Sequence, residues 1–369
     1  MRFSRIVAVI VVLAGVSIWQ GCSDGGNGPP GGGKSIGGEP TTTFLAYLDP
    51  TVGNVNVTNI PTSGNIATVT GSPYLAGSQP VSMAVTPDGK FLYAVNFNGQ
   101  SINEYAIASD GTLSQPVPPT PTGFQPVALA IDSQERFAIS LNQGASSLTI
   151  FSINSATGAL AKVGTDIALN VTTPKAIAIS GNFVYVASAN AIDVLIYTPA
   201  TTTFAFATGS PFSAGPAATN IVALYSPAQA PNVLYAADTN TNSLLSFSAD
   251  TNGVLTAGLS SGTGTQPAAM IADDQNRFLF VANQASSNIS VFAVDAATGA
   301  LTPATTSLVS TGTGPNALAY DPVTKFLFVG LSGTRQIALF GVNTTTGALT
   351  SVSSFNTNNA SAAMVVAKP

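Results

Sequence analysis

The chain has 369 residues, of which only 7% are charged, and its 11 Lys and Arg against 16 Asp and Glu give a net charge of −5 at pH 7. So few cations argue against nucleic acid or an anionic lipid surface as a partner. The sequence contains no His and one Cys. It therefore lacks the commonest general base near neutral pH, the usual imidazole metal ligand and any internal disulfide, and we expect neither a metal site nor a cofactor.

Residues 1–21 have the features of an export signal. Arg2 and Arg5 precede an apolar run over 6–18 that is too short to span a bilayer comfortably. Gly21 and the lone Cys22 follow, which resembles a bacterial lipoprotein signal. This resemblance implies cleavage before Cys22, lipidation of that residue and a lipid-anchored place in the cell envelope. Plain secretion with a free Cys and a retained membrane anchor remain alternatives.

Residues 22–40 are rich in Gly and Pro and contain almost no apolar side chains. Such a segment has too little apolar surface to bury for a folded core. We expect a flexible tether between the anchor and the folded domain.

The remaining chain, 41–369, is built from a repeated unit, seen clearly in 278–303. One apolar strand of each unit opens with a residue that recurs about every 47 positions. These openers are Phe44, Phe91, Phe137, Phe183, Val233, Phe278 and Phe326. The residue fourteen positions after each opener is usually aromatic. An apolar run such as 80–85 precedes most of them, and a weaker run follows a turn such as 296–301. Four short strands per unit are typical of a β-propeller blade.

The two ends of the chain complete one another. Residues 44–69 supply the second, third and fourth strands of a unit without a first, and 361–367 read as a first strand with nothing after it. We therefore predict an all-β fold, a seven-bladed β-propeller with four antiparallel strands per blade, whose closing blade is shared by the N- and C-termini. Such closure removes the free sheet edges that an open array would leave.

The segment FLFVANQASSNISVFAVDAATGALTP resembles the YVTN-type propeller repeat. The whole array over 41–369 is similar to the seven-bladed lactonase family, which includes bacterial 6-phosphogluconolactonases. That resemblance implies lactone hydrolysis. The His side chains among the catalytic candidates of that family have no counterpart here.

The predicted channel mouth, where the chain enters each innermost strand, holds few polar side chains. The entry ring consists of Val81, Val127, Lys175, Asn220, Ala268, Asn316 and Ala362, and nearby strand links hold Asp49, Asp238 and Arg335. Six of these side chains are suited to bind a carboxylate, a phosphate or sugar hydroxyls, and they are Lys175, Asn220, Asn316, Asp49, Asp238 and Arg335. Alternatively, the amides and carboxylates merely cap hairpins and Lys175 is exposed at the rim.

Most other charges have simpler explanations. We expect a solvated structural role for those in the turns between first and second strands, which are Asp88, Lys90, Asp132, Glu135, Arg136, Asp273, Asp274, Arg277, Asp321 and Lys325. We expect Glu104, beside Tyr105 in a third strand, to be a partly exposed outer charge.

These features favour a non-catalytic binding or interaction module of the cell envelope. Its partner would be a small molecule, a glycan or an envelope protein, and it would meet the membrane only through its lipid anchor. One alternative is a lactonase-type hydrolase, favoured by the family resemblance and opposed by the missing His. Another is a structural surface-coat protein, because neutral Thr, Ser and Asn surfaces suit such coats.

Overall fold

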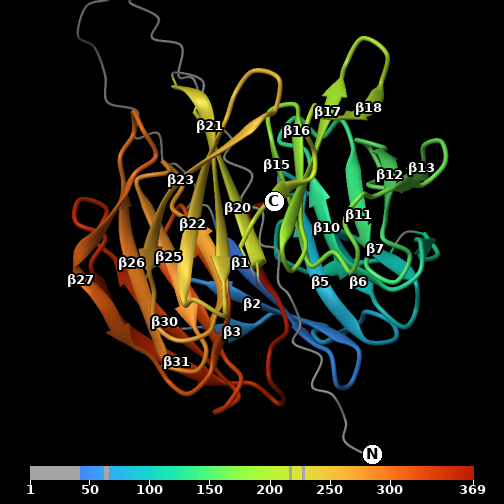
Figure 1. The fold of residues 1–369 in the computed structure, drawn as a ribbon. Coiled ribbons are helices and arrows are strands. Elements are labelled where there is room, and N and C mark those ends of the chain that lie inside the picture. The colour runs from blue at the N-terminus through green and yellow to red at the C-terminus, as the bar shows by residue number, and fades with distance from the viewer. Residues whose placement is uncertain (1–41, 62–65, 116, 216–217, 227–228) are drawn as a thin grey trace, which may run out of the picture.

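The computed structural model describes residues 42–61, 66–115, 117–215, 218–226 and 229–369. These residues form seven β-sheets arranged as the blades of a propeller around a common axis (Figure 1). None of them forms a helix of the length and hydropathy that crossing a bilayer requires. The predicted signal 1–21 and the tether 22–40, with Cys22, lie outside the described residues.

Each blade has four antiparallel strands, ordered from the innermost to the outermost as predicted. Blade 1 consists of β5 (Pro80–Val85), β6 (Phe91–Asn96), β7 (Ser101–Ile107) and β8 (Leu113–Ser114). Blade 2 consists of β10 (Pro126–Ile131), β11 (Ala138–Asn142), β12 (Ser147–Ile153) and β13 (Leu160–Lys162). Blade 3 consists of β15 (Ala176–Ser180), β16 (Phe183–Ala187), β17 (Ala191–Thr198) and β18 (Thr203–Phe206). Short strands β9 (Thr120–Pro121), β14 (Ile167–Ala168) and β19 (Phe212–Ser213) extend the outer edges of these three blades.

Blades 4 to 6 have longer outer strands. Blade 4 consists of β20 (Ala218–Ser226), β21 (Gln229–Asp238), β22 (Ser243–Ala249) and β23 (Leu255–Gly262). Blade 5 consists of β24 (Pro267–Ala272), β25 (Phe278–Asn283), β26 (Asn288–Val294) and β27 (Leu301–Ser310). Blade 6 consists of β28 (Pro315–Asp321), β29 (Phe326–Leu331), β30 (Gln336–Val342) and β31 (Leu349–Asn356).

Blade 7 joins the two ends of the described chain, which confirms the predicted closure. It consists of β32 (Met364–Ala367), β1 (Thr43–Asp49), β2 (Asn54–Ile60) and β3 (Ala67–Thr68), with β4 (Tyr74–Leu75) also pairing with β2. Strand β32 pairs antiparallel with β1, from Phe44 opposite Ala367 to Tyr47 opposite Met364. The innermost strands contact one another in an unbroken ring, β5, β10, β15, β20, β24, β28, β32 and back to β5.

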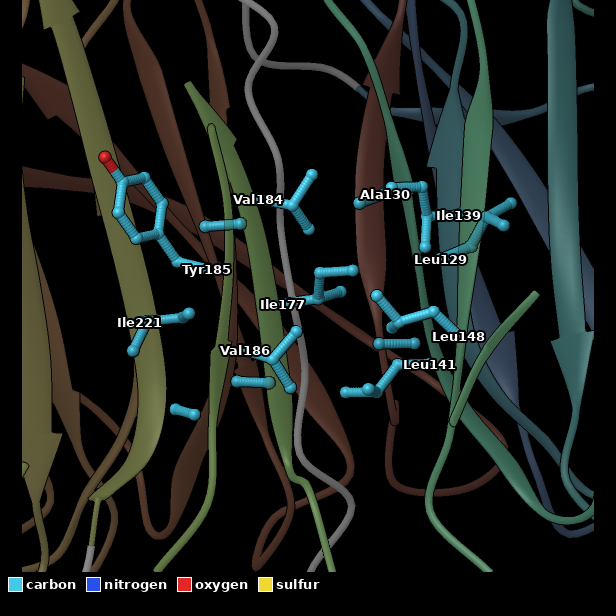
Figure 2. Close-up of a cluster of buried hydrophobic side chains, with 14 of the residues drawn as sticks. Leu129, Ala130, Ile139, Leu141, Leu148, Ile177, Val184, Tyr185, Val186 and Ile221 are labelled. Carbon is cyan, nitrogen blue, oxygen red and sulfur yellow. The ribbon is translucent and has the colours of Figure 1, made fainter. Parts of the chain in front are cut away.

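The second strands are buried on both faces because each blade packs between two neighbours. Every residue of β6, β11 and β25 is buried. Figure 2 shows part of one such core, in which Leu129 of blade 2, Ile177 and Val186 of blade 3 and Ile221 of blade 4 belong to a single cluster. Strands buried on both sides have continuous apolar runs instead of alternating patterns.

Five of the strand openers pack on a glycine turn of the next blade, and these are Phe44, Phe91, Phe183, Val233 and Phe278. A methyl group added to Gly158 would overlap the ring of Phe91 in the preceding blade, and Gly158 has a φ of +73°. The Tyr93 hydroxyl, two residues after Phe91, donates a hydrogen bond of 2.7 Å to the Gly158 carbonyl. At this turn of blade 2, between β12 and β13, Gly158 supplies the backbone conformation and the space that the neighbouring ring fills.

Blade 3 departs from the common strand register. In blade 1, Leu92 pairs with Tyr105, and equivalent pairs recur in the other blades. In blade 3, Val184 pairs with Leu195, so Tyr197 lies two positions beyond the expected partner. The constant spacing in the sequence therefore conceals a shifted hairpin in the blade that carries Lys175.

Candidate functional site

The face that carries the predicted site is formed by the loops entering the innermost strands and by the links between second and third strands. We call it the entry face and the opposite end of the propeller the turn face. The six predicted residues form two groups on the entry face. Lys175 lies in blade 3, Asn220 and Asp238 lie in adjacent blade 4, and the second group lies in blades 6 and 7: Asn316, Arg335 and Asp49.

Blades 3 and 4 are in direct contact on this face. Strands β15 and β20 touch, and the Ala218 amide donates a 2.9 Å hydrogen bond to the Ala189 carbonyl. Blade 5 separates the two groups on one side, and blades 1 and 2 separate them on the other. The residues of the predicted site thus lie in two separate groups on different sides of the mouth, and we refer to each group as a half-site of the prediction.

The predicted entry ring coincides with a repeated β-bulge, with one correction. The pairing register shifts around Val81, Val127, Ala268 and Asn316. In blade 4 the shift falls between Ala218 and Asn220, so position 219 occupies the bulge. The assignment of Asn220 to this ring was wrong, because a uniform offset cannot locate a one-residue bulge.

Asn220 belongs to the strand interior. It aligns with Ser82 and Ala128, each the first residue paired after the bulge. Only 1% of its surface is exposed. It therefore contributes to packing beneath the mouth.

Lys175 is a cation that forms no ion pair with a carboxylate of the described residues. Its backbone amide donates a 2.8 Å hydrogen bond to the Ala187 carbonyl, directly before β15 begins, and its side chain is half-buried. Five other cations of the described chain form ion pairs, namely Lys90–Asp88, Arg136–Asp132, Lys162–Asp166, Arg277–Asp273 and Lys325–Asp274. Lys175 has no such pair within the described ranges, so its ammonium is available to an anionic ligand.

Arg335 is a second cation of this kind on the entry face. It is exposed, has a φ of +55° at the corner of the link from β29 to β30, and forms no ion pair with any described residue. Its carbonyl accepts a 2.8 Å hydrogen bond from Thr357. Lys368, the remaining unpaired cation of the described chain, follows β32 and lies on the turn face.

Asp238 combines a capped hairpin with an unused acceptor. Its Oδ1 accepts hydrogen bonds from the amides of Asn240 at 2.8 Å and Thr241 at 3.2 Å. Its Oδ2 is buried and has no hydrogen-bond partner among the described residues. A methyl group on Gly215 would come within 2.8 Å of Oδ2, so the entry loop covers the carboxylate.

The same arrangement recurs in other blades, which indicates a structural origin. Asn96, Asn142 and Asn283 end their second strands, are fully buried and bond to side chains at the start of the third strand. Each lies beneath an entry-loop glycine, Gly77, Gly123 or Gly264. Asp238 and Asp49 are the two residues at this repeated position that carry a negative charge.

Asp49 and Asn316 hold the C-terminal segment in place. The Asn359 amide donates a 2.9 Å hydrogen bond to Asp49 Oδ2, and Asn316 donates a 2.9 Å hydrogen bond to the Ser361 carbonyl. These contacts lead directly into β32. The role that geometry assigns to both residues is blade closure, while Asn316 Oδ1 stays buried and without a partner in the described chain.

Charges on the turn face are less solvated than expected. Asp132, Asp273 and Asp321 are at most 1% exposed. Asp132 Oδ2 accepts a 2.6 Å hydrogen bond from Arg136 Nε, which raises the pKa of that guanidinium. The expectation of a solvated role was wrong for these three residues, because the turns fold back over their carboxylates.

Glu104 was also mispredicted, since it is 1% exposed and lies between blades 1 and 2. It accepts hydrogen bonds from Thr120 Oγ1 at 2.5 Å and from the Leu160 amide at 3.2 Å. Burial raises the pKa of its carboxyl group. The equivalent positions of other blades hold apolar residues such as Ile150 and Val291, an alignment that could have signalled a buried carboxylate.

Neither entry-face group contains the ligands of a metal centre. No cluster of three or more Asp, Glu, His or Cys side chains suited to a metal ion occurs within the described ranges. What the entry face offers is two unpaired cations and several acceptor oxygens set in a rigid rim. Such groups suit an anionic, hydroxyl-bearing ligand.

Comparison with known proteins gives the family. The family model for a seven-bladed β-propeller lactonase matches residues 51–180 and 174–312. The chain belongs to this lactonase family. The resemblance inferred from the sequence is thereby confirmed.

Solved structures show the same fold at low sequence identity. The periplasmic gluconolactonase PpgL of Pseudomonas aeruginosa matches with a TM-score of 0.74 and 18% identity, over 89% of this chain and 100% of that one. A Bacteroides fragilis protein provisionally named a 6-phosphogluconolactonase gives 0.74 and 18%, over 89% and 98%. AztD of Citrobacter koseri in its apo form gives 0.58 and 11%, over 88% and 97%. No curated protein matches the chain in sequence.

Proposed function

We propose that the protein is a lactone hydrolase that binds a sugar lactone at the half-site of blades 3 and 4. The observation that carries this proposal is the lactonase family match, which extends across 51–312. The similarity in fold to a gluconolactonase supports the sugar class of the substrate. The family evidence thus favours the hydrolase over the non-catalytic module that composition alone suggested.

Lys175 is the residue best placed to assist the chemistry. In lactone hydrolysis, water adds to the ring carbonyl carbon, the acyl C–O bond breaks, and the ring oxygen leaves as a hydroxyl. Negative charge develops on the carbonyl oxygen in the transition state, and a fixed cation nearby stabilises it. No described carboxylate forms an ion pair with the ammonium of Lys175, so the ammonium is free to contact the developing negative charge.

Proton transfer must proceed without imidazole, because the sequence contains no His. Asp238 is the carboxylate of this half-site, and its Oδ2 has no described hydrogen-bond donor. The entry loop covers that oxygen. In this proposal Asp238 accepts a proton from the attacking water only when the loop around Gly215 moves aside.

The test is hydrolysis of glucono-1,5-lactone by the full chain, followed at constant pH by alkali uptake and corrected for the spontaneous reaction. We expect Lys175→Ala to lower kcat/KM at least tenfold, or about 1.4 kcal/mol in transition-state stabilisation. Lys368→Ala is the matched control, since it removes an unpaired lysine from the turn face. Absence of turnover in the wild-type protein would contradict the proposal, and equal rates in the two variants would exclude Lys175.

A binding module without catalysis is the second candidate. It is favoured by the missing His and by the coverage of Asp238. In that case calorimetry would detect gluconate or 6-phosphogluconate binding that Lys175→Ala abolishes, while no lactone turnover occurs. Besides such small ligands, a binding module of this kind would have a glycan or an envelope protein as its partner.

We also propose that the propeller is held at the cell envelope by a lipid on Cys22. The support is the sequence of residues 1–22 alone. Mass spectrometry of the mature N-terminal peptide would detect the acyl chains. Cys22→Ser should release the protein from the membrane fraction, and an unlipidated Cys22 in the wild-type protein would contradict the proposal.

A further inference from the structure

The outer edges of the seven blades are of two kinds. In blades 7, 1, 2 and 3 the outermost strand is broken into pieces of two to four residues, such as β8 and β9. In blades 4, 5 and 6 it is a single strand of eight, ten and eight residues, namely β23, β27 and β31. These three blades are neighbours and form one flank of the propeller (Figure 1).

This flank carries no charge on its edge strands. Residues 255–262, 301–310 and 349–356 contain no Asp, Glu, Lys or Arg. Among the broken edges, that of blade 2 carries Lys162 and Asp166 as an ion pair of 2.8 Å, while 67–75, 113–121 and 203–213 are also uncharged. The length of the edge strands is therefore what distinguishes this flank from the other blades. The flank also exposes apolar side chains, with Leu259 83% exposed, Leu308 60% and Val352 45%.

Exposed edge strands are templates for pairing, because half of their backbone amides and carbonyls point outward. Proteins block them with charged residues, short strands or bulges. Here the bulges and Pro303 of β27 are the blocking features that remain, and the charges are missing. Leu259 and Val352 lie where the register with the third strand shifts, so the bulges themselves carry exposed apolar groups.

We propose that this flank pairs with the same flank of a second copy of the chain. Two β27 strands would lie antiparallel across a two-fold axis, with β23 of one copy near β31 of the other. An identical patch on both partners is what a two-fold interface requires. Residues 304–307 bulge out between the two paired pieces of β27, so its ten residues face the seven positions Asn288–Val294 of β26. At about 3.3 Å per residue, the edge is roughly 23 Å long.

The distribution of charge favours a second copy over other partners. The chain has a net charge of −5, so two copies repel one another over most of their surface. An edge without charges is where that repulsion is weakest. A basic partner would gain no ion pairs with β23, β27 or β31, because none of them has an acidic side chain.

The test is the molar mass of the full chain by sedimentation equilibrium over a concentration series. We expect the wild-type protein to dimerise and Leu308→Lys to raise the dissociation constant at least tenfold. The matched control is Val163→Lys, which places the same charge at a 43% exposed apolar residue beside the broken edge of blade 2. A wild-type protein that stays monomeric at every concentration would overturn the proposal, and so would equal effects of the two variants.

Hydrogen exchange gives a second measurement that does not depend on a variant. Amides of 301–310 should exchange more slowly at high than at low protein concentration. Those of β13 and β14 should not change. Protection confined to other regions would place the dimer contact elsewhere and refute pairing through β27.

Discussion

Met364 offers a direct test of closure by the C-terminal strand. It is fully buried in β32, pairs with Tyr47 of β1, and its terminal methyl group lies beside Gly330 of blade 6. The same core cluster includes Met83 and Leu92 of blade 1 and Phe328 of blade 6. One side chain from the last residues of the chain thus packs against both neighbours of the closing blade.

Truncating Met364 to Ala removes three heavy atoms from this core and leaves a cavity. Changes of this kind cost about 2–5 kcal/mol, and we expect about 3 kcal/mol because the rigid sheets on either side limit collapse. The free energy of unfolding of a domain is typically about 5–15 kcal/mol, so this loss is a large fraction of the total. For a chain of this size it corresponds to a decrease in Tm of roughly 6 °C.

The measurement is urea denaturation of both proteins followed by tyrosine fluorescence and circular dichroism. Val352→Ala is the control, since Val352 is 45% exposed on β31, and its free energy of unfolding should change by less than about 0.5 kcal/mol. If Met364→Ala left the midpoint and slope unchanged, β32 would not belong to the cooperative core. The structural account of closure would then be wrong.

Three further predictions concern the contacts between blades. Deleting residues 359–369 removes β32 and its ties to Asp49 and Asn316, and it should abolish cooperative melting; a truncated protein that melts cooperatively at the same temperature would refute this. Thr43→Ala removes the 2.6 Å hydrogen bond to the buried Asp321 carboxylate, which joins blades 7 and 6, and should lower the free energy of unfolding by about 1.5–3 kcal/mol in urea titrations; an unchanged value would show that the bond contributes nothing. Burial raises the folded-state pKa of Glu104 above its usual 4.5, so protonation of its carboxyl group stabilises the fold. As pH rises from below 4.5 to neutrality, the wild-type protein should therefore lose stability relative to the Glu104→Gln variant. A stability difference that is constant with pH would contradict the raised pKa.

The family resemblance was visible in the sequence because each blade repeats one physical problem. A strand pressed between two neighbours must be apolar on both faces, and in most blades its opening side chain meets a glycine turn of the next blade. Phe91 and Gly158 satisfy this pair of conditions, as do Phe278 and Gly347. Periodicity therefore predicted the blade count and the split blade correctly.

The candidate site was only partly predictable. Lys175 and Arg335 could be placed on the entry face by counting from the strand openers, but their lack of ion pairs depends on where every carboxylate lies. The position of Asn220 was misjudged by one residue because the bulge in blade 4 leaves no mark in the spacing. The roles of Asp49 and Asn316 in closure depend on their hydrogen bonds with Asn359 and Ser361. These two partners are distant in sequence from the residues they contact, and they lie in a segment without a distinctive motif.

The burial of Glu104 also shows that contacts between blades were not predictable from the sequence. Alignment with Ile150 and Val291 indicates a covered position, but not that the carboxylate finds its hydrogen-bond donors in Thr120 and in Leu160 of the next blade. A pattern of apolar residues records which faces are covered on average. It does not record which single polar group finds partners there.

The amino-acid sequence alone determined the repeat, the number of blades and the joining of the chain ends, since these follow from the period of apolar and turn residues. Only the tertiary structure decided which charges stay unpaired on the entry face, which carboxylates are buried, and which three outer edges remain long and uncharged. The reason is that the former depend on local chain geometry, whereas the latter depend on contacts between blades that lie tens to hundreds of residues apart.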